Sequence, residues 1–237
     1  MTIALRPRVG AYSRRGVAFV LRHRWSVPLS LASTVSLAYL AAEMREGDLE
    51  GVDAVLAGHV QGWRGRLDTL MYALTAAGGG VGMSLVAVVT ILVLARARRP
   101  RATLFMTTAS IGTLLLVMGL KLLFQRARPS IAYMIETPSS FSFPSGHALG
   151  SMGVTASLVV VLYAVRAPKL VCRLATLLVA LFVPGVALSR VYFGVHYPSD
   201  VVGGALAAAA WVSGLTGWFY PRLFPGEQTI EPAPQPR

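Results

Sequence analysis

Long apolar runs dominate the chain and alternate with short polar segments. Six runs approach the length of about 20 mostly apolar residues that a helix needs to cross a bilayer. These runs lie at 25–42, 67–95, 102–124, 147–165, 174–188 and 201–220. The fifth run is the shortest and contains Pro184, so its ends are the least well defined. The pattern predicts an all-α fold, an integral membrane bundle of six transmembrane helices.

Composition supports a membrane protein. Charged residues are only 14% of the chain, and the mean hydropathy is +0.60, whereas soluble domains carry about 25% charged residues. The net charge of +12 would suggest nucleic acid in a soluble protein. Here the basic residues cluster between apolar runs, so we expect a bilayer partner and no nucleic acid. The single cysteine, Cys172, excludes an intrachain disulfide.

The basic residues also predict an orientation. In a six-span arrangement, the basic segments 1–24, 96–101 and 166–173 share one side with the C-terminus. The positive-inside rule makes that side cytoplasmic, in a plasma membrane. Residues 1–24 are then a basic cytoplasmic N-terminus and 25–220 the six-span domain. The Pro-rich polar tail 221–237 is predicted to be disordered and cytoplasmic.

Two segments have rival interpretations. The stretch "SRRGVAF" at 13–19 resembles a twin-arginine export signal, but Arg22, His23 and Arg24 interrupt the apolar run that should follow. The glycine-rich "AAGGGVGMS" at 76–84 lacks the Lys-Ser/Thr pair of a phosphate loop. It lies in the middle of a span, so we expect it to serve close helix packing.

The opposite, outer side holds the segments 43–66, 125–146 and 189–200. A first cluster of polar residues on this side lies in "KLLFQRARP" at 121–129, where Lys121 and Arg128 are seven positions apart. On a helix this spacing is nearly two turns, so both cations would point from one face. Pro129 disfavours helical geometry at Arg128 and predicts a helix end near it. The pair suits a doubly charged anion, although interfacial snorkelling is the better explanation of the pair taken alone.

A second polar cluster on this side reads "PSGH". Ser145 is a good N-cap, and the free N–H groups of the following first turn, including that of Gly146, form an anion site. His147 lies in that first turn. A capped helix that happens to carry an interfacial histidine explains this cluster equally well.

The third cluster is "SRVYFGVHYPSD" at 189–200. Pro198 suits the first position of the last helix, which places Asp200 in its first turn, four residues after His196. A carboxylate bonded to one ring nitrogen makes the other nitrogen a better nucleophile or base. An acid that merely favours the helix dipole is the alternative.

Taken together, the three clusters match the requirements of phosphoryl transfer. They supply donors for the phosphoryl oxygens, a nucleophile and an acid for the leaving oxygen. The cations are Lys121, Arg128 and Arg190, and the acid–base groups are His147, His196 and Asp200. No metal site is expected, because three cations would repel the ion. These residues alone leave open which histidine attacks.

The same residues resemble the signature of the type 2 phosphatidic acid phosphatase superfamily, which comprises membrane lipid phosphatases. That signature reads K-x6-R-P, P-S-G-H and S-R-x5-H-x3-D, and every position is filled from Lys121 to Asp200. The resemblance implies that His196 attacks phosphorus and forms a phosphohistidine while Asp200 orients it. His147 would protonate the leaving group and then activate water. The phosphoryl oxygens would be bound by Lys121, Arg128, Ser145, Gly146 and Arg190, with no metal and no cofactor.

The resemblance also implies a lipid phosphate or diphosphate as substrate, held at the outer leaflet. Undecaprenyl diphosphate, phosphatidic acid and phosphatidylglycerol phosphate are the candidates. A lipid A phosphatase or a lipid phosphotransferase would carry the same signature, whereas six spans disfavour the soluble haloperoxidases that share the anion site. A transporter or lipid-binding protein is the alternative from another class, since intramembrane charges also line transport paths. Oligomeric state is not encoded in these patterns.

Overall fold

The structure is a computed structural model that describes residues 13–223. Its helices are joined by turns and by an irregular loop at 125–145, with no strand in the described range. Its helices are α1 (Ser13–Glu46), α2 (Glu50–Gln61), α3 (Asp68–Gly78), α4 (Gly80–Arg96), α5 (Pro100–Phe124), α6 (Gly146–Ala164), α7 (Lys169–Tyr192) and α8 (Pro198–Leu223). Five of them contain segments long and apolar enough to span a membrane, and the bent pair α3–α4 makes a sixth. The predicted all-α, six-span membrane fold is therefore confirmed.

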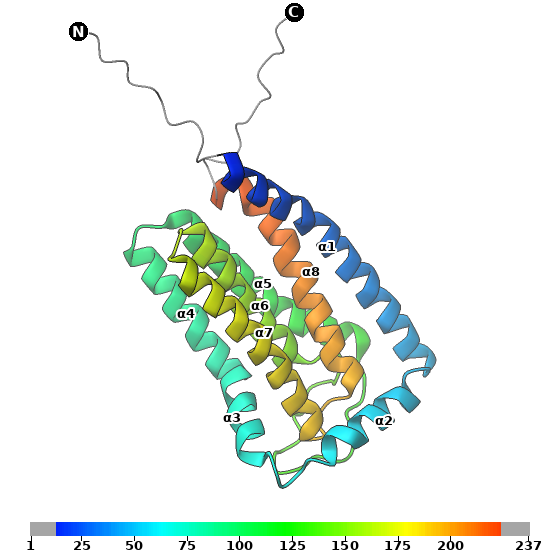
Figure 1. The fold of residues 1–237 in the computed structure, drawn as a ribbon. Coiled ribbons are helices and arrows are strands. Elements are labelled where there is room, and N and C mark those ends of the chain that lie inside the picture. The colour runs from blue at the N-terminus through cyan, green and yellow to red at the C-terminus, as the bar shows by residue number, and fades with distance from the viewer. Residues whose placement is uncertain (1–12, 224–237) are drawn as a thin grey trace, which may run out of the picture.

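The helices form one elongated bundle (Figure 1). Helix α8 packs against α1 along one side and against α6 in the middle, while α5 and α7 also flank α6. Helices α3 and α4 lie on the side away from α1. Helix α1 begins and α8 ends at the same end of the bundle, and the short α2 lies at the opposite end.

The second predicted span is bent where its glycines lie. Helix α3 ends at Gly78 and α4 starts at Gly80, with 48° between their axes. A Cβ on Gly78 would lie 2.4 Å from a methyl carbon of Val186, so α3 approaches α7 more closely than any larger residue allows. The predicted packing role of the glycine segment is confirmed at this contact, and the bend was not predicted.

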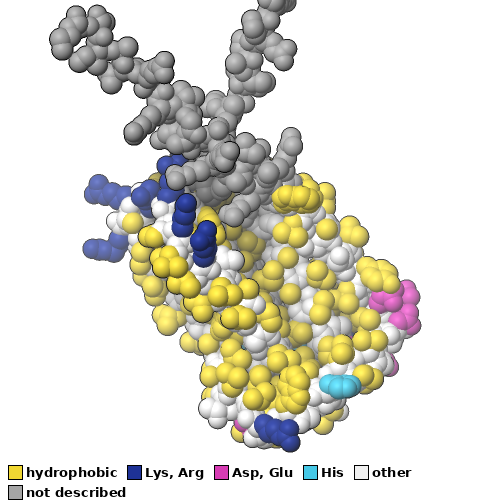
Figure 2. Space-filling view, in the orientation of Figure 1, with side chains coloured by type: hydrophobic (Ala, Val, Ile, Leu, Met, Phe, Trp, Pro, Cys, Tyr) yellow, Lys and Arg dark blue, Asp and Glu magenta, His cyan; other side chains and the backbone are white. Residues whose placement is uncertain are grey.

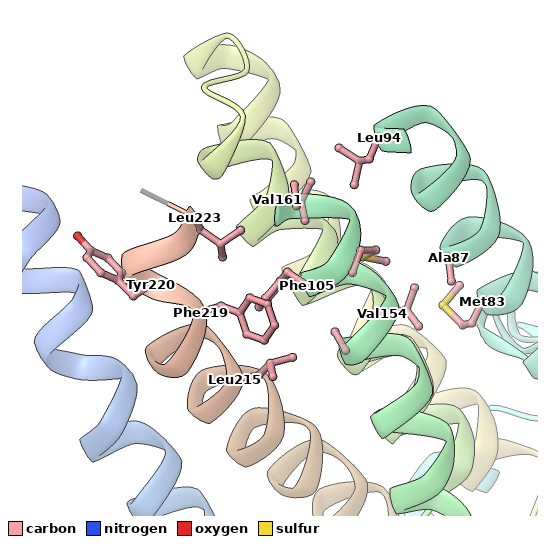
Figure 3. Packing of buried hydrophobic residues seen from close by; sticks show 13 residues of the cluster. Met83, Ala87, Leu94, Phe105, Val154, Val161, Leu215, Phe219, Tyr220 and Leu223 are labelled. Carbon is pink, nitrogen blue, oxygen red and sulfur yellow. The ribbon is translucent and has the colours of Figure 1, made fainter. Parts of the chain in front are cut away.

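The largest apolar cluster of the described residues lies toward the end of the bundle where α1 begins and α8 ends. Figure 3 shows this cluster at close range. Phe105 of α5 and Phe219 of α8 pack edge to face with ring centroids 5.7 Å apart. Val154 and Val161 of α6 and Leu94 of α4 complete the same cluster. A smaller apolar cluster around Tyr192 and Phe193 lies toward the α2 end, together with the polar groups of the site.

The outer surface matches a bilayer environment. Large aliphatic side chains are exposed along the spans, among them Leu114, Leu115, Leu122 and Leu123 of α5, as expected for helices solvated by lipid rather than water. In Figure 2 most of the visible Lys and Arg side chains gather at the end where α4 leads into α5, and a further basic side chain lies at the opposite end. The Asp and Glu side chains lie toward the α2 end.

Three helices extend clearly beyond their predicted bounds. Helix α1 runs over Ser13–Glu46, whereas the predicted first span covers 25–42. Helix α7 runs over Lys169–Tyr192 with Pro184 inside it, so the fifth span is longer than the predicted 174–188. Helix α8 continues to Leu223, beyond the predicted start of the tail at 221. The remainder of that tail and residues 1–12 lie outside the described residues.

Candidate active site

The three sequence motifs meet at the α2 end of the bundle because each one begins or ends a span. Ser145 accepts a hydrogen bond from the backbone N–H of Ala148 and caps α6, and α8 starts at Pro198, both as predicted. The backbone N–H of Ser145 in turn donates to the carbonyl of Asp200 at 2.9 Å. This last bond joins the start of α6 to the start of α8, so the second and third motifs form one unit.

His196 and Asp200 form the buried centre of the site. The Nδ1 atom of His196 lies 3.3 Å from Oδ2 of Asp200, and the two residues are 3% and 0% exposed. The same carboxylate oxygen accepts hydrogen bonds from the hydroxyl of Ser142 and, at 2.9 Å, from the backbone N–H of Tyr197. A carboxylate held by several donors stays ionised and fixes the proton of the imidazole on Nδ1.

The other imidazole nitrogen faces a cation. Nη1 of Arg128 lies 3.1 Å from Nε2 of His196. A guanidinium can only donate, so Nε2 carries the lone pair and Nδ1 carries the proton that faces Asp200. Arg128 is held in turn by the carbonyl oxygens of Ser140 and Val195, each at 2.7 Å. Nε2 is therefore the unprotonated, nucleophilic atom, and its lone pair accepts a hydrogen bond from an anion-binding group that a phosphoryl oxygen can take over.

Arg190 and His147 face the same centre from α7 and α6. Arg190 is 4% exposed and donates through Nη1 to the hydroxyl of Thr75 on α3. Its buried Nε has no acceptor among the described residues, which leaves a donor available to a ligand. A Cβ on Gly79 would lie 3.3 Å from Nε2 of His147, so the bend between α3 and α4 makes room for this ring.

Lys121 reaches the start of α6 from α5. Its ammonium group donates to the carbonyl of Phe141, and its Cε lies 3.8 Å from where a Cβ on Gly146 would be. Helix α5 ends at Phe124, and the cap Gln125 adopts the left-handed conformation. The prediction that Lys121 and Arg128 share one helical face is therefore wrong, and a loop brings Arg128 to the site instead.

The charges of the site do not cancel. Four cations, Lys121, Arg126, Arg128 and Arg190, stand against two carboxylates, Asp53 and Asp200. Counting these lysine, arginine and aspartate side chains alone, two positive charges remain uncompensated. A phosphate monoester carries about −1.5 to −2 at neutral pH, so a phosphoryl dianion would bring the site close to neutrality.

Burial sets the protonation of the central histidine. It lowers the pKa of His196 to about 4, and the nearby charges of Arg128 and Arg190 lower it further, against the opposing effect of Asp200. The ring is therefore neutral at physiological pH. Burial also acts to lower the pKa of Arg126, but Asp200 and Asp53 outweigh it and the net shift is upward.

A cavity of about 690 Å³ opens beside His196. Its walls come from α2, from the end of α1 and from the loop after α5, with Glu50, Gln61 and Ser130 among the polar lining residues. Apolar residues such as Met44 and Ile131 line the rest. Within residues 13–223, no group of three or more His, Cys, Asp or Glu side chains is arranged to hold a metal ion.

A family profile described as the PAP2 superfamily matches residues 101–224, which is more than half of the chain and contains all three motifs. The chain belongs to the PAP2 superfamily. Curated PAP2 relatives match over shorter segments. The decaprenylphosphoryl-5-phosphoribose phosphatase of Mycobacterium tuberculosis is 43% identical over 93 residues, 38% of this chain and 46% of the relative. The phosphatidylglycerophosphatase B of Bacillus subtilis is 37% identical over 90 residues, 36% and 42% of the two chains.

Two solved PAP2-type structures share the fold. The phosphatidylglycerolphosphate phosphatase of Bacillus subtilis superposes with a TM-score of 0.73, covering 80% of this chain and 95% of that one at 23% identity. Aquifex aeolicus LpxE superposes with a TM-score of 0.52 over 70% and 93% of the two chains at 24% identity. The matched segments span less than half the length of the curated relatives. The structural superpositions, in contrast, cover nearly the whole of the two solved chains.

Several polar residues of this PAP2 site were not singled out by sequence. Arg126 lies within the spacer of the first motif, where the signature leaves every position open, and Ser142 lies just before the second motif. Asp53 comes from α2, far from the motifs in sequence, and is 2% exposed. The segment 43–66 was placed on the outer side, but no pattern distinguishes Asp53 from its acidic neighbours.

Proposed function

We propose that this protein is a metal-independent lipid phosphate phosphatase that works through a phosphohistidine on His196. The proposal rests on one observation, that the imidazole of His196 has an anionic partner at one nitrogen and a cationic partner at the other. Asp200 lies 3.3 Å from Nδ1, and Arg128 lies 3.1 Å from Nε2. Such a ring is oriented, neutral and free to attack at Nε2, next to a group that binds the phosphoryl oxygens.

In the first step, Nε2 of His196 attacks phosphorus and the bond from phosphorus to the lipid oxygen breaks. The imidazole gains positive charge, which the carboxylate of Asp200 stabilises across the Nδ1 proton. Lys121, Arg128 and Arg190 bind the phosphoryl oxygens together with the backbone N–H groups at the start of α6. His147 gives its proton to the leaving lipid oxygen.

In the second step, water takes the place of the lipid alcohol. His147, now neutral, removes a proton from the water as its oxygen bonds to phosphorus. The bond from Nε2 of His196 to phosphorus breaks, which releases inorganic phosphate and restores the neutral ring. His147 thereby regains a proton in place of the one that it gave to the lipid alcohol in the first step.

We assign the substrate to the class of lipid phosphates and diphosphates. The relatives support this class, since they are named for a decaprenyl-linked phosphoribose and for phosphatidylglycerol phosphate. The cavity beside His196 has mixed polar and apolar walls, as a lipid head group with its first chain atoms requires. The predicted orientation places the site at the outer leaflet, with both termini in the cytoplasm.

A phosphate-release panel tests the proposal. Purified protein in detergent micelles would be offered polyprenyl diphosphate, phosphatidic acid, phosphatidylglycerol phosphate and polyprenyl-linked phosphoribose. We expect release from at least one of them, unaffected by EDTA and blocked by vanadate. Loss of activity in EDTA that magnesium restores would contradict the metal-free mechanism. No release from any lipid would favour a transport or binding function, and transfer of phosphate to another alcohol would favour a phosphotransferase.

A further inference from the structure

A buried acidic residue from outside the signature motifs contacts the catalytic unit. Asp53 lies in the first turn of α2 and is only 2% exposed. Its Oδ1 accepts the backbone N–H of Ser199 at 2.8 Å, and its Oδ2 accepts the Ser199 hydroxyl. A carboxylate this deeply buried costs free energy unless it is paired, and its partner is Arg126.

Arg126 links the two carboxylates of the site. Its Nη2 lies 2.8 Å from Oδ2 of Asp53, and its Nη1 lies 2.8 Å from Oδ1 of Asp200. The guanidinium also stacks on the ring of Tyr197, with Cζ 4.1 Å from the centroid. A planar fork between two acceptors fixes the rotation of both, because its donors cannot move independently.

The two oxygens of Asp200 therefore have separate partners. Oδ1 is held by Arg126, while Oδ2 faces Nδ1 of His196 and accepts from Ser142. Rotation of the carboxylate would break both sets of bonds at once. The chain of contacts runs from α2 through Arg126 and Asp200 to the imidazole, without Asp53 or Arg126 touching the ring.

We propose that Asp53 and Arg126 are a positioning pair that fixes the carboxylate of Asp200 and, through it, the imidazole of His196 for phosphoryl transfer. The pair makes α2 part of the catalytic unit, although α2 lies outside the segment 101–224 that matches the family. Its electrostatic role follows from the same contacts. Asp53 offsets the charge of Arg126, so that Asp200 keeps its negative charge available to the imidazole as it becomes positive. The inference rests on the proposed phosphohistidine mechanism.

The decisive variant is Asp53→Asn, which keeps a side-chain acceptor for Ser199 and removes the charge. We expect the rate constant of the first phosphoryl transfer, measured in single turnovers with enzyme in excess, to fall about 10- to 100-fold, the range typical for outer groups that orient a reacting side chain. The KM for the lipid should stay within about twofold of the wild-type value, because Asp53 is not assigned to the phosphoryl oxygens. Asp48→Asn is the matched control, an exposed acid in the same segment that should leave the rate unchanged.

A single-turnover rate constant does not depend on the fraction of inactive protein, and the stoichiometry of vanadate binding counts competent sites independently. Arg126→Lys supplies a second variant, which keeps the charge but cannot bridge both carboxylates, and it should show a similar loss. In the double variant Asp53→Asn/Arg126→Lys the loss should be smaller than the product of the two single losses. An Asp53→Asn rate constant equal to wild type would overturn the positioning role. A wild-type protein that released no phosphate would instead overturn the proposed function.

Discussion

At the scale of single residues, the site depends on how each imidazole is surrounded. His196 lies between a carboxylate at Nδ1 and a guanidinium at Nε2, so its tautomer and its reactive atom are both determined. In sequence, only the spacing of four to Asp200 suggested a partner. The guanidinium contact depends on the loop after α5, whose path no local pattern encodes.

The neutral state of His196 predicts how the protein responds to pH. Burial holds its pKa at about 4, below the ordinary value of about 6.5, so at pH 5 about nine-tenths of the rings are neutral. The charged groups that face the ring are Asp200, Arg128 and Arg190. We expect the ¹⁵N imidazole resonance that disappears in His196→Ala to keep its neutral shift from pH 8 down to pH 5. A titration midpoint of this resonance near pH 6.5 would contradict the account.

The residue scale also shows what sequence reasoning can find in such a site. Residues with fixed spacing to a motif, such as Lys121, His147 and Asp200, were identified because the motifs carry their own chemistry. Asp53 was not, since its importance comes only from a tertiary contact with Arg126 at 2.8 Å. Long-range ion pairs of this kind depend on how helices pack, which hydrophobic periodicity does not specify.

At the scale of elements, the site is built from helix ends. The cap at Ser145 and the start of α8 at Pro198 were predictable, because N-caps and first-turn prolines have local causes. The apolar run 102–124 ends where α5 ends, whereas the helix end predicted near Arg128 from Pro129 was wrong. The bend at Gly79 was missed, because its glycine-rich stretch was interpreted only as a packing surface and glycines permit a bend without requiring one.

The close approach of α3 to α7 predicts a sensitive glycine. In Gly78→Ala the new methyl group would meet Val186, whose methyl carbon lies 2.4 Å from the Cβ position. Separation of α3 from α7 would also disturb the contact between Thr75 and Arg190. We expect a loss of about 1–3 kcal/mol in the free energy of unfolding, typical of overpacking, together with reduced turnover. Thermal unfolding in detergent and phosphate release would measure the two effects.

Gly80→Ala is the control for that substitution. Gly80 lies two positions further along, and a Cβ there has nothing within 4 Å. It should leave both stability and turnover close to wild type. If Gly78→Ala and Gly80→Ala behaved alike, the packing of α3 against α7 would not be as close as described.

At the scale of the whole molecule, polarity is divided between the two ends of the bundle. The largest apolar cluster lies toward the end where α1 begins and α8 ends, and the polar cluster of the site lies at the α2 end beside smaller apolar clusters. The six-span pattern and the basic segments made this division predictable, because both follow from the energetics of a bilayer. The cavity beside α2 was not predictable, since it depends on how α2 lies against the loop after α5.

The concentration of basic segments on one side of the bundle predicts the orientation of the protein in the membrane. With Cys172 replaced by alanine, a cysteine introduced by Asp48→Cys should react with a membrane-impermeant maleimide on intact cells. A cysteine introduced by Arg98→Cys, in the basic segment between α4 and α5, should react only after the cells are opened. The reverse pattern would place the site on the cytoplasmic side and would contradict the proposed outer-leaflet substrate.

The most direct test of the central claim is to trap the phosphoryl group on the protein. After acid-free quenching of a reaction with a ³²P-labelled lipid phosphate, the wild-type protein should carry label that is stable to base and labile to acid, as phosphohistidine is. The variant His196→Ala should carry no label. The variant His147→Ala should keep the wild-type fold but show no turnover. Label that persists in His196→Ala, or normal phosphate release by that variant, would show that His196 is not the nucleophile.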